Sequence, residues 1–269
     1  MTANEWATEH TPQDRPNSAR IYDYLLGGYH NFEPDRLAAE KYIAALPDAR
    51  LGAQANRAFL RRVVHLCLEQ GIDQFLDLGS GIPTVGNVHE IAQQTNPAAR
   101  VIYVDIDPIA VAHSLAILRD NPNAAAIQAD IAQPEQVLDH AEVKRLLDFC
   151  RPVAVLMVAV LHFVTDDDQA YRTVRVFRDA LTLGGYVAIT HFTFDDAPPD
   201  MIERFKKVMA KPSLSKVRTH AETAQFFDGL ELVAPGLVHP PLWRPEGPDD
   251  VFLTQPERVV GWAGVGRRP

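Results

Sequence analysis

The stretch from Phe75 to Pro108 constrains the fold of this 269-residue chain more than any other part of the sequence. It begins with a short apolar run that leads into the turn Asp77-Leu78-Gly79-Ser80-Gly81, and it ends with a second apolar run, Val101–Asp107. Short apolar runs that are broken by glycine and alternate with helical patterns are typical of βαβ units. In such a unit, the first turn and the start of the helix lie at the carboxyl edge of a parallel sheet. The stretch therefore predicts an α/β fold with a ligand site at that edge.

Two features of this stretch predict a ligand that carries a nucleoside. Glycine has no side chain, so Gly79 and Gly81 would let a ligand come close to the backbone. Asp105 ends the second apolar run, where a carboxylate is placed to accept hydrogen bonds from ribose hydroxyls. These residues do not say which nucleoside cofactor is bound.

Asp77 helps to decide between cofactors. It lies two residues before the first glycine, where a dinucleotide-binding turn rarely carries a charge. Its carboxylate could face a cationic ligand group, or it could simply hydrogen-bond its own loop. The spacing Gly79-x-Gly81-x-x-Thr84 also lacks the third glycine of the dinucleotide fingerprint. A nicotinamide-dependent oxidoreductase is therefore an alternative that the residues disfavour.

Composition and charge restrict the kinds of partner that the protein is expected to bind. The net charge of −9 disfavours a large polyanion, so we expect no nucleic-acid partner. Cys67 and Cys150 lie far apart, without metal or redox spacing, which fits a reducing cytoplasm. The apolar run at 153–161 is far shorter than the roughly 20 residues that a membrane span needs, and residues 1–20 lack an apolar signal core. We therefore predict a cytoplasmic protein with no membrane partner and no metal.

The rest of the chain divides into a polar tail, a helical block and the sheet domain. Residues 1–17 are predicted to be a flexible tail, 18–70 an N-terminal helical lid, and 71–269 the ligand-binding α/β domain with a substrate-side insertion at about 193–256. In the first helix, Ile21, Tyr24 and Leu25 are predicted to share one face. Further strands are predicted at 124–129, 152–158, 186–192, 230–233 and 257–265. Further helices are predicted at 34–46, 50–70, 108–119, 135–148, 165–183, 199–209 and 215–227, with another beginning near Asn87.

Residues 75–81 resemble motif I of the class I S-adenosylmethionine (SAM) methyltransferases. The resemblance implies a Rossmann-like fold with a seven-stranded, mostly parallel sheet flanked by helices. In that family the turn binds the methionine part of SAM and the acid after the second strand binds the ribose, which carries over to Asp77, Gly79, Gly81 and Asp105. The sequence departs from the family pattern at Pro83, so the loop after Gly81 is expected to be longer than usual.

Four further blocks resemble an actinobacterial group of SAM-dependent methyltransferases that was long described as a domain of unknown function. Together with motif I they cover nearly the whole chain. The resemblance implies SAM as cofactor and S-adenosylhomocysteine as product, but it does not identify the methyl acceptor. The blocks are Arg20-Ile21-Tyr22-Asp23-Tyr24 with Gly27-Gly28 and Asn31-Phe32, then 56–62, 158–164 and 226–230.

The resemblance also implies further cofactor contacts. In SAM methyltransferases an acid after the third strand accepts from the adenine amino group, which points to Asp130, although this residue could instead cap the next turn. Arg57 could clamp the SAM carboxylate through its bidentate guanidinium, or it could be a solvated helix charge. The other expected contacts are Ser80, Ile106, Asp107, Ile131, Ala159 and Asn31.

The candidate catalytic residues are His162, His191 and Tyr24, with His30 as a further possibility. His162 follows one core strand and His191 lies near the end of the next, at the carboxyl edge, where either could act as a general base or be a structural residue. Tyr24 and His30 belong to the N-terminal block, which either covers the cofactor or simply packs against the sheet domain. A base is needed only if the nucleophile must lose a proton.

Two charged clusters have simpler explanations than a site. Asp166-Asp167-Asp168 is predicted to cap the helix that follows, rather than to bind a metal. A basic cluster is predicted to form a solvated face, or it could attract an acidic substrate; its members are Lys206, Lys207, Lys211, Lys216 and Arg218. The sequence therefore favours a SAM-dependent methyltransferase with a small-molecule acceptor, over a protein that binds SAM or S-adenosylhomocysteine without turnover.

Overall fold

The structure is a computed structural model that describes residues 14–82, 86–208, 215–247 and 250–269. Most of the predicted tail, residues 1–13, and the predicted long loop at Pro83 lie outside the described residues.

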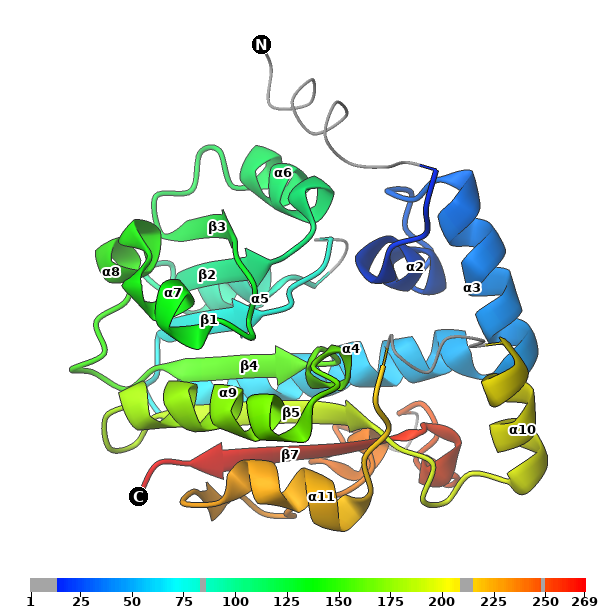
Figure 1. Ribbon diagram of the computed structural model, residues 1–269. Coiled ribbons are helices and arrows are strands. Elements are labelled where there is room, and N and C mark those ends of the chain that lie inside the picture. The colour runs from blue at the N-terminus through cyan, green and yellow to red at the C-terminus, as the bar shows by residue number, and fades with distance from the viewer. Residues whose placement is uncertain (1–13, 83–85, 209–214, 248–249) are drawn as a thin grey trace.

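One seven-stranded sheet forms the centre of the molecule (Figure 1). Its strand order is β3-β2-β1-β4-β5-β7-β6; the first five strands are parallel, and β7 is antiparallel to both β5 and β6. The prediction of a seven-stranded, mostly parallel sheet is confirmed. The strands are β1 Gln74–Leu78, β2 Arg100–Asp105, β3 Ala124–Gln128, β4 Ala154–Val158, β5 Tyr186–Phe192, β6 Glu231–Leu232 and β7 Gly261–Arg267.

Helices cover both faces of the sheet. Because side chains alternate along a strand, β1 sends Phe75 to one face and Leu76 and Leu78 to the other, and both faces are buried. The first face packs against α4, α5 and α6, and the second against α7, α8, α9 and the segment around Phe226. The helices are α2 Ser18–Leu25, α3 Glu33–Ala45, α4 Ala49–Glu69, α5 Val88–Thr95, α6 Pro108–Ile117, α7 Pro134–Asp139, α8 Ala141–Leu146, α9 Asp167–Ala180, α10 Pro199–Val208 and α11 His220–Ala224, with 3-10 turns at 161–163, 225–227, 240–242 and 256–258.

Local capping explains several helix starts. Asn87 begins α5 with a capping box, in which the Glu90 carboxylate accepts from the Asn87 amide at 2.8 Å. Asp166 caps α9 by accepting from the Gln169 amide at 2.8 Å, as the acidic triplet predicts.

Two predicted helices differ from the structure. The single helix predicted at 135–148 is two short helices, because His140 is extended and its ring accepts from the Glu142 amide, which starts α8 afresh. The helix predicted at 215–227 begins only at His220, where Thr219 provides a capping box with Glu222.

The N-terminal helices lie beyond the carboxyl ends of the parallel strands. Figure 1 shows α2, α3 and α10 on that side of the sheet, with α4 running from them along one sheet face. The α4 residues Phe59, Val63 and Cys67 are fully buried in the same cluster as Phe75 of β1. Thus α4 is part of the packed core, whereas α2 and α3 stand over the strand ends. A lid movement of the 18–70 block stays a prediction.

Candidate active site

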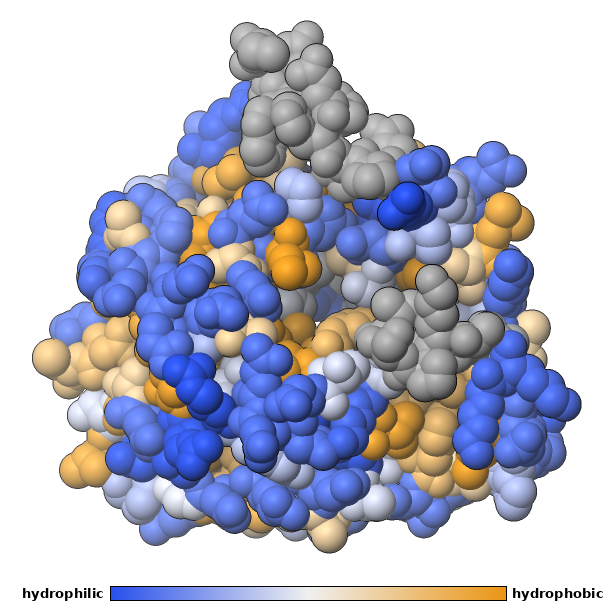
Figure 2. Space-filling model, in the orientation of Figure 1, coloured by the Kyte–Doolittle hydropathy of each residue, from blue (hydrophilic) through white to orange (hydrophobic). Residues whose placement is uncertain are grey.

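A cavity of about 1040 Å³ lies at the carboxyl ends of the parallel strands. Pockets for drug-sized ligands span about 300–1,000 Å³, so this one has room for two ligands. One side is lined by the ends of β1, β2 and β3, and the other by apolar side chains of α2, α3, β5 and α10. Figure 2 shows the face hollowed near its middle, with apolar side chains along the hollow.

The glycine turn after β1 is fixed by two different constraints. Gly79 and Gly81 both have positive φ, 69° and 66°, which favours glycine. A Cβ on Gly79 would lie 2.2 Å from the Val160 side chain, so this glycine is needed for packing as well. A Cβ on Gly81 would meet nothing within 4 Å, which leaves open space for a ligand against the backbone. Ser80 lines the cavity between them.

Asp105 is joined directly to this turn. Its carboxylate accepts from the Gly81 amide at 2.7 Å and from the Asp107 amide at 2.8 Å. Burial raises the pKa of Asp105, which these amide hydrogen bonds partly offset. Asp105 therefore lies at the cavity in the position expected of a ribose acceptor.

Asp77 is a buried carboxylate with few compensating contacts. Burial raises its pKa to about 7, the Asp105 charge acts in the same direction, and the Arg57 guanidinium opposes both. Arg57 also lines the cavity and donates to the Gly86 carbonyl at 2.7 Å. A cation and an anion thus lie beside the glycine turn, as a ligand with both an ammonium and a carboxylate requires.

The ends of β2 and β3 supply an apolar surface and a further acid. Ile106 lines the cavity with 63% of its surface exposed, which is unusual for a large apolar side chain at a strand end. Asp130 and Ile131 follow β3 and also line the cavity. One oxygen of Asp130 accepts from the Ala132 amide at 2.9 Å, so the turn-capping alternative is realised while the residue still faces the cavity.

Asp107 is not among the residues that line the cavity. It is buried, and it caps α6 by accepting from the Ile109 amide at 3.0 Å. Its other oxygen lies 3.7 Å from the buried Arg20 guanidinium, which also binds Asp35 at 2.8 Å. Asp107 therefore connects the N-terminal block to the sheet domain, and a direct cofactor contact has no support in its position.

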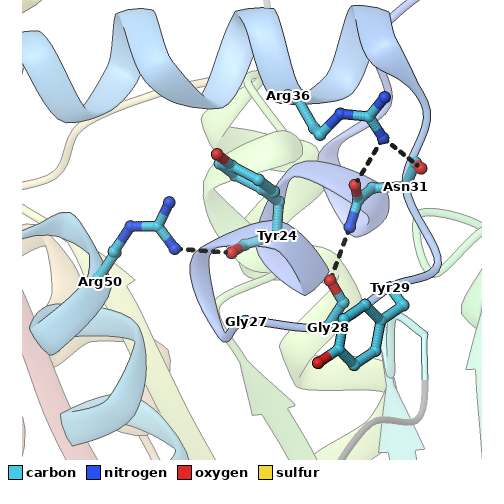
Figure 3. Close-up of a pocket in the computed structure, with 7 residues that line it drawn as sticks. All are labelled: Tyr24, Gly27, Gly28, Tyr29, Asn31, Arg36 and Arg50. Atoms are coloured by element: carbon cyan, nitrogen blue, oxygen red, sulfur yellow. Dashed lines mark hydrogen bonds between the residues drawn. The ribbon is translucent and has the colours of Figure 1, made fainter.

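Tyr24 and Asn31 line a separate surface pocket of about 320 Å³ (Figure 3). The Tyr24 hydroxyl donates to Glu40 at 2.6 Å, and Arg50 lies over its ring. The Asn31 amide donates to Asp23 at 2.8 Å and to the Gly28 carbonyl at 3.0 Å. His30 does not line the cavity either, and its ring packs edge-on against the ring of His113. The structure does not bring these predicted residues to the strand ends.

A chain of hydrogen bonds that the sequence did not predict ties the N-terminal block to the cavity. The Ala159 amide donates to the Thr190 hydroxyl at 2.8 Å, and this hydroxyl donates to the Asn56 side chain at 2.8 Å. The Asn56 amide donates to the Tyr22 hydroxyl at 3.0 Å, and Tyr22 donates to the Ala53 carbonyl at 3.2 Å. Ala159 has a φ of 58°, a conformation that costs a non-glycine residue energy and clusters at functional sites. Tyr22 and Asn56 belong to sequence blocks singled out above, but Thr190 carried no signal.

His162 lines the cavity, but its protonation is strongly disfavoured. Burial lowers its pKa to about 3, and His191 and Arg218 act in the same direction. Its Nδ1 atom is buried without a hydrogen-bond partner. The imidazole is therefore neutral. Catalytic bases work best with a pKa near the operating pH, so a pKa this low makes His162 a weak base.

His191 has both ring nitrogens engaged. Arg218 can only donate, so its Nη1 donates to Nε2 of His191 at 2.8 Å, and Nδ1 then donates to the Phe192 carbonyl at 2.9 Å. Burial lowers the pKa of His191 to about 4. The lone pair that a general base needs is already used, so the structural alternative describes His191.

Arg218 is buried, which corrects the prediction of a solvated face for this residue, whereas Lys206 and Lys207 are exposed and Lys211 lies outside the described residues. Its guanidinium donates to Asp167 at 2.9 Å and to the Val164 carbonyl at 3.0 Å. Lys216 also pairs with Asp167. These bonds fix the segment that follows β4, including the 3-10 turn that carries His162.

Two searches of the described residues gave negative results. Among the described residues, no group of three or more His, Cys, Asp or Glu side chains could hold a metal ion. Within residues 14–82, 86–208, 215–247 and 250–269, no helix combines the length and the apolar character that crossing a membrane requires.

Comparisons with known proteins identify the family. The S-adenosyl methyltransferase family matches residues 4–269. A solved candidate methyltransferase from Thermobifida fusca is 42% identical over 94% of this chain and 95% of its own, with a TM-score of 0.87. A DUF574 family protein from Streptomyces avermitilis is 39% identical over 96% of this chain and 99% of its own, with a TM-score of 0.89. None of the curated proteins compared matches. The chain therefore belongs to the S-adenosyl methyltransferase family, and it is an enzyme that uses SAM as its cofactor.

Proposed function

We propose that the protein transfers the methyl group of SAM to a small-molecule acceptor bound in the same cavity. The observation that carries this proposal is the continuity of one cavity from the polar strand ends to an apolar wall. A single cavity of about 1040 Å³ can hold cofactor and acceptor side by side, as methyl transfer requires.

The polar half suits the parts of SAM in order along the strand ends. We assign the methionine part to the glycine turn, with Asp77 facing its ammonium and Arg57 its carboxylate. Asp105 accepts from the ribose hydroxyls, Ile106 packs against the adenine, and Asp130 accepts from the adenine amino group. The open space at Gly81 and the exposed apolar side chain of Ile106 support this placement.

The bound cofactor supplies a methyl group on a sulfonium, which is transferred by in-line displacement. The chain contributes by orienting the two reactants, and positioning of this kind can lower a barrier by about 7–11 kcal/mol. Ala159 directly follows β4, lines the cavity and is held by Thr190. We assign His162 to contact the acceptor, since it lines the cavity after the same strand.

Calorimetric titration with SAM, S-adenosylhomocysteine and NAD tests the cofactor site. We expect micromolar binding of the first two and none of the third. A methyl-transfer assay that detects S-adenosylhomocysteine with pooled small molecules then tests turnover. Tight SAM binding with no product from any acceptor would instead support a protein that binds without turnover.

The remaining expectations about partners belong to the same proposal. We propose a cytoplasmic enzyme without a nucleic-acid partner. The net charge of −9 and the two unpaired cysteines, Cys67 and Cys150, support it. Retention on a heparin or DNA column at physiological salt would contradict the exclusion of nucleic acid.

A further inference from the structure

The apolar side of the cavity is an aromatic wall built by three distant parts of the chain. We define the acceptor wall as the cavity-lining members of one apolar cluster: Tyr42, Leu46, Ala49, Phe192, Met201, Phe205 and Val260. Phe205 has its ring centroid 5.8 Å from that of Tyr42 and 5.2 Å from that of Phe192. Rings at these separations form the offset and edge-on arrangements that aromatic groups prefer, so a further ring can extend the set.

The charges near the acceptor wall leave little to attract an ionic acceptor. Arg258 donates to both oxygens of Asp48, at 2.9 and 2.7 Å, which neutralises the pair that lines the cavity there. Lys41 also lines the cavity, but its side chain is exposed, so it offers an ionic acceptor no buried partner. A charged acceptor would lose its hydration against this wall without gaining a buried partner, and that loss is costly.

The end of the cavity at His162 and His191, where we place the reacting group, is more positive than the acceptor wall. We call it the positive corner. Lys216 and Arg218 share one carboxylate, Asp167, and Arg218 also donates to His191. Arg218 and His191 both disfavour a positive charge on His162. Glu222, the other carboxylate that acts on His191, is half-buried. The buried Arg218 guanidinium beside the two histidines favours an oxygen anion over a cationic group next to His162.

The two histidines of this corner do not provide a strong base. Nε2 of His191 already accepts from Arg218. His162 is half-buried at the cavity, and it resists protonation because its ring is desolvated beside the same guanidinium. A hydroxyl group that reacts here must therefore ionise readily without help, which an aliphatic alcohol does not, whereas a phenol has a pKa of about 10 in water.

From the wall, the paired charges and the positive corner, we propose that the acceptor is an uncharged, planar aromatic molecule and that its methylated atom is a phenolic oxygen. This inference rests on the proposed function. In the reaction, the phenol first loses its proton to water. The phenolate oxygen then forms a bond to the methyl carbon while the carbon–sulfur bond breaks, and its electron pair stays on sulfur. The products are an aryl methyl ether, neutral S-adenosylhomocysteine and one released proton.

A set of bicyclic probes with one carbon skeleton tests the acceptor class. The probes are 2-naphthol, its saturated analogue decahydro-2-naphthol, 2-naphthylamine and 2-naphthoate. With S-adenosylhomocysteine present, we expect calorimetric binding of 2-naphthol, and with SAM we expect its methyl ether by mass spectrometry. Methylation of the saturated alcohol, the amine or the carboxylate at a higher kcat/KM would overturn the inference. Failure of 2-naphthol to bind would overturn it too. Absence of SAM binding would instead refute the proposed function.

The pH profile tests whether ionisation belongs to the acceptor. For naphthols of equal size but different hydroxyl pKa, we expect log kcat/KM to rise with pH and to level off at the pKa of each acceptor. A midpoint that stays the same for all acceptors would reveal an enzyme base and overturn this mechanism. With His162→Gln, we expect less than about a tenfold loss and an unchanged slope.

Wall variants test the placement. Phe205→Leu should raise KM for 2-naphthol about tenfold, while the SAM dissociation constant changes less than about twofold. Phe149→Leu is the matched control, because Phe149 is a partly buried aromatic that packs on the far core cluster and not on the cavity. If both variants leave KM unchanged in folded protein, the acceptor does not contact this wall. Equal losses in both would indicate a general effect on the fold and would equally contradict the placement.

Discussion

The backbone amide of Gly81 donates a hydrogen bond of 2.7 Å to the carboxylate of Asp105, so the turn after β1 and the end of β2 form one unit. The other Asp105 oxygen accepts from the Asp107 amide at 2.8 Å. A ligand that binds this acid therefore also meets the glycine turn. The first two predictions therefore concern the two ends of this hydrogen bond, Asp105 and Gly81.

Replacing Asp105 with alanine should weaken SAM binding by about ten- to a hundredfold, because a charged acceptor for the ribose is lost. The variant also leaves the Gly81 amide without its partner, which loosens the turn. Isothermal calorimetry measures the change. Asp139→Ala is the control, since Asp139 is an exposed acid away from the cavity. Unchanged affinity in folded Asp105→Ala protein would refute the ribose assignment.

Gly81→Val should abolish detectable SAM binding while the protein stays folded. The new Cβ meets no atom of the described residues within 4 Å, but it occupies the space assigned to the ligand. Gly71→Val separates this effect from backbone strain, because Gly71 has a similar positive φ of 77° and equally open surroundings. We expect both variants to lose about 1–3 kcal/mol of stability and only Gly81→Val to lose binding. A Gly81→Val variant with normal affinity would place the ligand elsewhere.

Asp77 should make SAM binding depend on pH. Burial raises its pKa to about 7, and the ionised form is the one that attracts an ammonium. Affinity should therefore rise about tenfold per pH unit between pH 5.5 and 7 and then level off. Asp77→Asn should bind more weakly and lose this dependence. Calorimetric titrations with SAM at several pH values test this prediction. A SAM affinity of the parent protein that does not change with pH would count against the ammonium assignment.

The same carboxylate should destabilise the ligand-free protein at neutral pH. Because the folded pKa lies above the unfolded one, the folded state holds the proton more tightly between pH 3.8 and 7. The free energy of unfolding therefore falls as pH rises through this range, by at most about 4 kcal/mol. Asp77→Asn should raise the melting temperature at pH 8 and have little effect at pH 4. No gain at pH 8 would mean that the carboxylate is better solvated than its burial implies.

His191 should have the opposite effect on stability. Its folded pKa of about 4 lies below the ordinary value of 6.5, so the unfolded state takes up the proton first. Its contribution to the free energy of unfolding is fully present above pH 6.5. This contribution is lost as pH falls toward 4, by up to about 3 kcal/mol. Urea unfolding of the parent and His191→Gln proteins at pH 7 and pH 5 measures it. The variant should lose less stability on acidification, and an equal loss would contradict the buried, neutral state.

The hydrogen-bond chain from Ala159 to Tyr22 should contribute to stability through Thr190. Thr190→Val leaves the Ala159 amide and the Asn56 oxygen without their partner, at a cost of about 1–3 kcal/mol for each. Thr190→Ser keeps the hydroxyl and should restore most of the loss. Chemical denaturation compares the three proteins. If Thr190→Val costs no more than Thr190→Ser, the hydroxyl hydrogen bonds do not carry this stability.

The strand ends were predictable because their sequence signals are local. Asp77, Asp105 and Asp130 each follow a short apolar run, and parallel strands place their carboxyl ends at one edge. The first helix shows where this reasoning stops. Ile21 and Leu25 line the cavity as one face, but Tyr22 joins them, whereas Tyr24 lies about 200° from Tyr22 around the helix. Which tyrosine faces the strand ends depends on how the helix is docked.

The sequence by itself determined the buried parallel strands, the helices between them and the glycine turn with its acids, because apolar periodicity and turn chemistry act between near neighbours. Tertiary structure alone decided which charged groups are buried and which are solvated. Arg218 looked like a surface cation, yet Asp167, 51 residues earlier in the chain, and the carbonyl of Val164 compensate its burial. Burying a charge is favourable only with such partners, and their positions are fixed by the packing of segments far apart in the sequence.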